Sequence, residues 1–170
     1  MTDFKALIHD VPDFPKPGVL FRDIGPLLLK HFPDTIDAMV AMLSDAEWQA
    51  VDALAGIESR GFIFAAALAQ AKGKGFVMIR KKGKLPKPAC HQEYALEYGT
   101  AALEIQQGAG QRLWLVDDVL ATGGTFMASA ELAQRANYHV DGFLSLINLR
   151  YLNEFQWNDR PVRSLIQYEN

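Results

Sequence analysis

The sequence has very little cysteine: Cys90 is the single one in 170 residues, so no intrachain disulfide can form. The cysteine content therefore gives no indication of an oxidising compartment. Long apolar runs are also missing, since none reaches the roughly 18 residues needed to span a bilayer. The first residues lack the apolar run of a signal peptide. These absences lead us to expect a cytoplasmic protein with no membrane partner.

An excess of basic residues is absent as well. The chain carries 17 Lys and Arg against 20 Asp and Glu, which gives a formal net charge of −3. A protein that binds nucleic acid regardless of sequence would carry a basic excess, so we expect no nucleic-acid partner. Apolar residues make up 49% of the chain, which excludes a disordered or collagen-like protein. The length predicts a single domain, residues 1–170.

From about residue 51 onward, short apolar runs alternate with helical patterns. The runs that predict buried strands are residues 51–57, 75–79, 113–116 and 143–149. This alternation is typical of βαβ units, so the predicted class is α/β with a mostly parallel twisted sheet flanked by helices. Ligands bind such sheets at the carboxyl ends of the strands, which makes the loops after Ile57, Ile79 and Val116 the candidate site. Upstream, we predict a short helix over residues 2–9 and a helix that opens at Pro33.

Residues 80–105 interrupt this alternation. Apolar residues recur at every second position along two segments: Tyr94, Leu96 and Tyr98, then Leu103 and Ile105. This period is typical of the two strands of a hairpin. A long excursion beside a candidate site is more often a lid or a binding loop than an unrelated insertion.

Residues 116–125 (VDDVLATGGT) follow an apolar strand and precede a helical pattern. Gly123 and Gly124 let the backbone approach a ligand closely, and N–H groups at a helix start favour an anion there. Thr122 and Thr125 add hydroxyl donors. The segment therefore predicts a phosphate-binding loop, and it lacks the lysine of a nucleoside-triphosphate P-loop.

Asp117 and Asp118 stand at the predicted end of the strand, just before this loop. Adjacent carboxylates repel each other, so ionising both is unfavourable unless cations or hydroxyl groups share the site. A sugar phosphate with two free hydroxyls and a divalent metal would supply both. The alternative is an Asp–Asp pair that only caps the following turn.

Together, the acidic pair and the glycine–threonine loop resemble the signature of the type I phosphoribosyltransferases, which use phosphoribosyl pyrophosphate (PRPP). The resemblance implies that family's fold, with an N-terminal hood segment at about residues 1–33 and a flexible hairpin lid at about residues 80–105. It implies that Asp117 and Asp118 hold the ribose. It also implies that the 5′-phosphate is bound by Ala121, Thr122, Gly123, Gly124 and Thr125.

Residues 15–24 (PKPGVLFRDI) resemble the base-recognition segment of the adenine-specific members of this family, and the likeness runs over about residues 12–168. It implies that Leu20 and Arg22 read the purine edge through main-chain groups, since adenine offers one donor and one acceptor there. Phe21 would form a stacking wall. The alternatives are that Phe21 is an ordinary core residue and that Arg22 pairs with Asp23 at the surface.

Two further segments match the same members. Residues 56–62 (GIESRGF) resemble the pyrophosphate loop, where members often carry a non-proline cis peptide. The resemblance implies that pyrophosphate is held by Ser59, Arg60, Arg80, Lys81 and Lys84. The alternative interpretation of the basic turn at residues 80–84 is a solvent-exposed segment that only increases solubility. Glu97 matches an acidic residue of the lid that is proposed to transfer a proton to or from the purine. The alternative is that Glu97 is a solvent-exposed loop carboxylate without this role.

The implied reaction is adenine plus PRPP giving AMP plus pyrophosphate, through an oxocarbenium-like displacement with Glu97, Asp117 and Asp118 as catalytic residues. The resemblance implies a homodimer and Mg²⁺ as cofactor, carried by PRPP because no run of fixed protein ligands is evident. The four histidines show no metal-ligand spacing. Two alternatives stay open: transfer to hypoxanthine, guanine or orotate, and a non-enzymatic regulator that binds PRPP.

Overall fold

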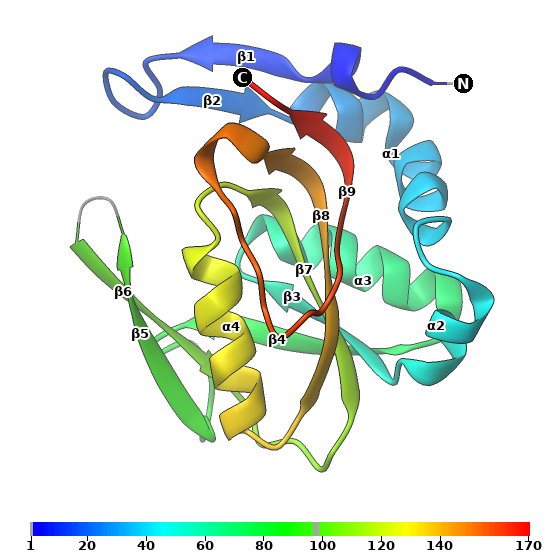
Figure 1. Ribbon diagram of the computed structural model, residues 1–170, viewed down its shortest axis with the longest axis vertical. Helices are drawn as coiled ribbons and strands as arrows, with labels where there is room; N and C mark the ends of the chain where they lie inside the picture. Colours follow the sequence, from blue (N-terminus) through cyan, green and yellow to red (C-terminus); the bar gives the residue numbers. More distant parts are fainter. Residues whose placement is uncertain (1, 97–98) are drawn as a thin grey trace. The chain divides into compact units, whose positions relative to one another are not determined.

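The computed structural model describes residues 2–96 and 99–170, and it divides the chain into two compact units, Met1–Ala38 and Met39–Asn170. Figure 1 labels the helices and strands. The predicted hood segment, about residues 1–33, falls within the first unit. None of the helices in the described part of the chain is long and apolar enough to cross a membrane.

The first unit is built on a two-stranded antiparallel hairpin. Its elements are η1 (Lys5–Leu7), β1 (His9–Pro12), β2 (Leu20–Asp23) and the start of α1 (Gly25–Val40). The helix predicted over residues 2–9 is wrong, because only one 3₁₀ turn forms before His9 enters a strand. The span of α1 consists of two helical pieces separated by a non-helical residue, His31 (φ −133°, ψ 26°), so a helical piece begins close to Pro33, as predicted. Proline suits the first turn of a helix, where its missing N–H costs no hydrogen bond.

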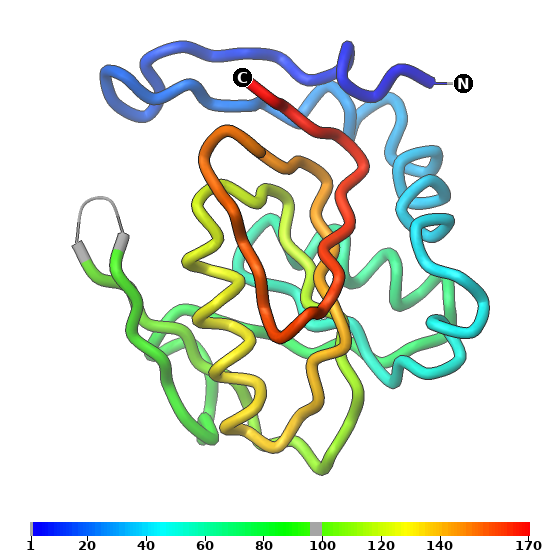
Figure 2. Tube along the Cα trace, viewed as in Figure 1, coloured from blue at the N-terminus to red at the C-terminus, as the bar shows by residue number. Residues whose placement is uncertain are grey.

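The second unit is a seven-stranded sheet in the order β5-β6-β4-β3-β7-β8-β9. Its strands are β3 (Ala53–Ile57), β4 (Gly75–Lys81), β5 (Cys90–Leu96), β6 (Gly99–Ile105), β7 (Arg112–Leu120), β8 (His139–Leu149) and β9 (Val162–Tyr168). The five strands from β4 to β9 in this order are parallel, and the β5–β6 hairpin joins β4 antiparallel. The mostly parallel α/β sheet is therefore confirmed, and Figure 2 shows the hairpin at one edge of it.

The helices of this unit are α2 (Asp45–Ala50), α3 (Arg60–Lys72) and α4 (Gly124–Arg135), with a short η2 (Arg150–Leu152) after β8. α3 follows β3 and α4 follows β7, and the two helices lie on opposite faces of the sheet (Figure 1). This placement follows from right-handed crossovers that leave the middle of the sheet in opposite directions. Strand β3, buried along its whole length, lies between them.

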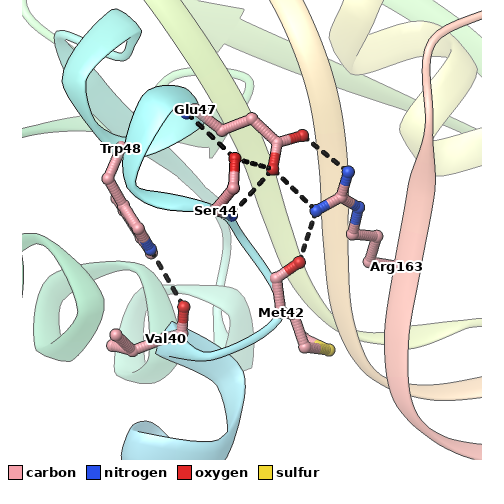
Figure 3. A network of polar contacts seen from close by, with 6 residues as sticks. All are labelled: Val40, Met42, Ser44, Glu47, Trp48 and Arg163. Carbon is pink, nitrogen blue, oxygen red and sulfur yellow. Dashed lines mark hydrogen bonds and ion pairs between the residues drawn. The ribbon is translucent and has the colours of Figure 1, made fainter.

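A polar network fixes α2 to β9 (Figure 3). The Ser44 hydroxyl accepts a hydrogen bond from the Glu47 N–H, and the Glu47 carboxylate accepts one from the Ser44 N–H at 2.8 Å. Arg163 of β9 donates to both carboxylate oxygens of Glu47, at 2.9 and 2.6 Å, and to the Met42 carbonyl. The buried Trp48 donates to the Val40 carbonyl at 2.9 Å. The bonds from Arg163 and Ser44 lower the pKa of Glu47 to about 2.

Glu47→Gln tests this network, because it keeps the shape of the side chain and removes its charge. The folded-state pKa is depressed, so the carboxylate stabilises the fold above its ordinary pKa of 4.5, and this contribution is lost as pH falls toward 2. We expect a loss of about 1 kcal/mol at pH 7, as for a well-aligned, partly exposed pair. Urea unfolding should show the difference shrinking as pH is lowered from 7 toward 3.

Asp45→Asn is the matched control, since Asp45 is an exposed acid in the same helical turn. It should change stability much less than Glu47→Gln. Equal losses for the two variants, or a Glu47→Gln loss that does not vary with pH, would contradict the role assigned to the Arg163 pair.

Candidate active site

The loops after β3, β4 and β7 meet at one edge of the sheet. These strands are neighbours and parallel, with Ile57 opposite Ile79 and Gly56 opposite Val116. Their carboxyl ends therefore lie side by side, which is where open α/β sheets bind ligands. The structure thus brings together the predicted pyrophosphate loop, the basic turn and the acidic pair with its phosphate loop.

The acidic pair lies inside β7 rather than at its end, because the strand continues to Leu120. Asp118 is buried and Asp117 is partly buried. The Asp118 N–H donates to Oδ1 of Asp117 at 2.8 Å, and Nε of Arg60 lies 2.9 Å from Oδ2 of Asp118. Arg60, predicted to hold pyrophosphate, therefore has a carboxylate of the acidic pair as its observed partner.

Burial raises the pKa of both carboxyl groups. The neighbouring charge of Asp118 raises the pKa of Asp117 further, to well above its ordinary value. The pKa of Asp118 is raised less, because the Arg60 guanidinium opposes the effect of burial. The pair therefore favours a ligand that donates hydrogen bonds or carries positive charge.

A glycine lets α3 come close to this pair. A Cβ atom built at Gly61 would lie 2.6 Å from the Val116 carbonyl oxygen and 3.1 Å from Oδ1 of Asp117. Only a residue without a Cβ permits this approach. The residue before α3, Ser59, follows a cis peptide bond between Glu58 and Ser59, as the family resemblance implies for this loop.

The predicted phosphate loop forms the connection from β7 to α4. Gly123 has a φ of +88° and precedes the first residue of the helix, Gly124. The loop and Asp117 line one small cavity of about 60 Å³, whose lining residues are Asp117, Val119, Leu120, Ala121, Thr122, Gly123, Thr125 and Phe126. N–H groups at the start of α4 and the helix dipole favour an anion beside this cavity.

Glu58 joins the loop after β3 to the last residues of β4, and sequence reasoning did not select it. Its carboxylate accepts hydrogen bonds from the Lys81 N–H at 2.8 Å and from Nε of Arg80 at 3.3 Å, while Arg80 also donates to the Lys84 carbonyl at 3.3 Å. Burial alone would raise the pKa of Glu58, but these bonds and the two positive charges outweigh it and lower the pKa. Glu58 thus stays ionised and fixes the basic turn beside the loop after β3.

Leu20, Phe21 and Arg22 lie on β2 of the first unit. Phe21 packs edge-on against Phe14, with ring centroids 5.1 Å apart. Arg22 is buried and forms an ion pair with Asp10 across the hairpin, so the alternative of a surface pair with Asp23 is wrong. Leu20 is exposed.

Glu97 lies outside the described residues. In the part of the chain that the structure describes, no group of three or more His, Cys, Asp or Glu side chains is placed to hold a metal ion.

Comparison with known proteins identifies the family. A model of the phosphoribosyl transferase domain matches residues 29–141. The chain is 52% identical to adenine phosphoribosyltransferase of Hydrogenovibrio crunogenus, over 96% of this chain and 95% of that protein. It is 50% identical to the protein of that name from Bdellovibrio bacteriovorus, over 98% and 99%. The chain belongs to the adenine phosphoribosyltransferase family.

Solved structures of the adenine phosphoribosyltransferase family share the fold. The enzyme of Rhodothermus marinus superposes with a TM-score of 0.86 at 38% identity, covering 97% of this chain and 96% of that one. The Saccharomyces cerevisiae enzyme, in complex with an imino-altritol bisphosphate and adenine, gives 0.85 at 35% identity, with 96% of each chain covered. The type I phosphoribosyltransferase fold is therefore confirmed.

Gly124→Val tests the phosphate loop. A Cβ at Gly124 would meet nothing nearer than 3.8 Å, so the fold should tolerate the side chain, whereas the side chain would keep the loop backbone away from a phosphate. We expect the KM for PRPP to rise by at least about tenfold, because at least one charge-assisted hydrogen bond to the phosphate is lost. Tm should change little. Steady-state kinetics and a thermal melt measure both.

Gly123→Ala is the contrasting variant. Its backbone has a positive φ, and a Cβ there would lie 2.7 Å from the Phe155 ring, so this substitution should lower Tm. Unchanged PRPP kinetics in Gly124→Val would show that the phosphate binds elsewhere.

Proposed function

We propose that this chain transfers the phosphoribosyl group of PRPP to adenine, giving AMP and pyrophosphate. The observation that carries the proposal is the cavity shared by Asp117 and the phosphate loop at the start of α4, in a chain of the adenine phosphoribosyltransferase family. The N–H groups of the loop suit a phosphate, and the carboxyl group of Asp117 suits sugar hydroxyls. A 5-phosphorylated ribose has both groups.

In the proposed reaction, the bond from C1′ to pyrophosphate breaks while adenine approaches the opposite face of the sugar. Positive charge develops on the ribose ring, and Asp117 and Asp118 would bind the ribose hydroxyls and stabilise that charge. Negative charge develops on the leaving pyrophosphate. The leaving group would be bound by Ser59, Arg60, Arg80, Lys81 and Lys84. The contacts of Glu58 with Arg80 and Lys81 support the placement of these two residues beside the loop after β3.

We propose that adenine is read by main-chain groups of Leu20 and Arg22, with Phe21 as a wall against the ring. The ion pair between the Arg22 guanidinium and Asp10 supports a main-chain role, because it occupies the side chain. The edge-on packing of Phe21 on Phe14 supports a fixed ring.

We propose that Mg²⁺ enters the site with PRPP. The carboxylates of Asp117 and Asp118 are the hard oxygen donors that Mg²⁺ prefers, but Arg60 already lies 2.9 Å from Asp118. This arrangement fits a metal whose ligands come mainly from PRPP oxygens and water. When bound, the metal would neutralise charge on the leaving pyrophosphate.

We also propose a homodimer that works in the cytoplasm. Phe76 and Met78 on β4 and Ile63 on α3 are each about 40% exposed (40%, 41% and 39%), and Phe76 packs against Phe62 of α3. Large apolar side chains on one exposed face support contact with a second copy of the chain. Cys90, the single cysteine, is unpaired, which fits a reducing compartment.

Incubating the protein with PRPP, Mg²⁺ and a panel of free bases tests the function. We expect nucleotide formation with adenine, and at least about a hundredfold lower kcat/KM with hypoxanthine, guanine and orotate, because their edges leave buried polar groups unpaired. Faster turnover of another base would overturn the assignment to adenine. PRPP binding with no nucleotide from any base would favour the regulator.

Glu97→Gln tests the proposed proton-transfer role of the lid carboxylate. Glutamine keeps the size and hydrogen bonding of glutamate but cannot titrate, so kcat should fall within the roughly 10²–10⁴-fold range of general acid–base catalysis, with KM values nearly unchanged. Glu97→Ala serves as the comparison. If Glu97 only stabilises a closed lid, glutamine should retain more than about a third of wild-type kcat, while alanine changes kcat and KM together.

A further inference from the structure

A segment that follows β8 and η2 contacts the phosphate loop from a distant part of the sequence. Nδ2 of Asn153 donates to the carbonyl of Ala121, the first residue of the loop, at 2.7 Å. The same amide donates to the Leu149 carbonyl at the end of β8, at 2.9 Å, and lies 3.1 Å from Oδ1 of Asn148. Asn153 therefore joins the phosphate loop to the end of the neighbouring strand.

The chemistry of this site requires an amide. Three oxygen atoms surround Nδ2 of Asn153, while its Oδ1 accepts a hydrogen bond from the Phe155 N–H at 3.3 Å. The two hydrogens of the amide group serve the two nearer oxygens, the Ala121 and Leu149 carbonyls, while its oxygen accepts from an N–H. A carboxylate of the same shape would set an oxygen against three oxygens.

Phe155, two residues after Asn153, contacts the same loop at Gly123. A Cβ atom at Gly123 would lie 2.7 Å from the Phe155 ring, so the ring packs directly on the backbone of the loop. The ring is itself held by Phe143 and Phe126, at centroid distances of 5.1 and 5.9 Å. Gly123, whose φ is positive, thus lies against a residue that packs on the core cluster.

Open space borders both sides of these contacts. Asn148 and Asn153 line a cavity of about 280 Å³, and Gly123, Gly124 and Phe155 line a second, open one. Because cavities border the loop beside these contacts, Asn153 and Phe155 are direct restraints on its shape in this region. A phosphate site works best when its N–H groups are already aimed before the ligand arrives.

We propose that Asn153 and Phe155 are positioning residues, which hold the loop at residues 121–125 in the conformation that binds the 5′-phosphate of PRPP. This inference rests on the proposed function. Neither residue lines the cavity that Asp117 shares with the loop. Their loss should therefore weaken PRPP binding and leave adenine binding and the chemical step nearly unchanged.

Asn153→Asp is the central test, with Asn158→Asp as its matched control on an exposed residue of the same connection. We expect the KM for PRPP to rise by about tenfold in Asn153→Asp, as for one lost hydrogen bond, with kcat and the KM for adenine within about threefold. Acidification should reduce the ratio of variant to wild-type KM, because the introduced carboxyl group regains a donor once it is protonated. Asn158→Asp should behave as wild type at every pH.

Phe155→Leu is the second variant, since leucine keeps an apolar side chain and the fold. It should also raise the KM for PRPP and leave the KM for adenine nearly unchanged. Its circular-dichroism spectrum should match that of the wild type. An unchanged KM for PRPP in both variants, or equal increases for PRPP and adenine, would overturn the inference. If the wild type forms no AMP, the proposed function fails, and calorimetric affinities of PRPP for wild type and Asn153→Asp still decide the positioning role.

Discussion

The burial of two adjacent carboxyl groups is the constraint on which this site depends. Asp117 and Asp118 lie within a central strand, where burial and mutual repulsion oppose their ionisation. The surroundings reduce this cost in part: Arg60 neutralises Asp118, and the Asp118 N–H donates to Asp117. A pair held in this way is unfavourable for the free protein and favourable for a ligand that brings hydroxyl groups and positive charge.

Other features of the site follow from that burial. Gly61 lets the first turn of α3 lie against β7, which brings Arg60 to the pair. Glu58, just before that turn, holds the basic end of β4. The loop after β7 then needs a positive φ at Gly123 to begin α4, and Asn153 and Phe155 hold that loop in place. The groups proposed to bind the two ends of PRPP thus lie at one edge of the sheet.

Sequence reasoning found what is local in the chain. Continuous apolar runs predicted β3, β4, β7 and β8, and the consecutive glycines and threonines marked the loop between β7 and α4. It missed β9, whose polar residues mask its period, and α2, which has six residues and is held by Arg163 from far along the chain. The roles of Glu58 and Asn153 were invisible for the same reason, since their partners lie 22 to 32 residues away. Tertiary contacts decided these features, and local propensity did not.

The measurement that tests this account most directly is the stability of Asp117→Asn set against its activity. Because the pKa of Asp117 is raised in the folded protein, its ionisation removes stability as pH rises above the ordinary value of 3.8. Asparagine still accepts the Asp118 N–H, so the variant should melt at a higher temperature than wild type at pH 8 and lose that advantage in acid. AMP formation should fall by at least about a hundredfold, as for a lost electrostatic contact to the transition state. A variant that is less stable at pH 8 and retains wild-type activity would contradict the account.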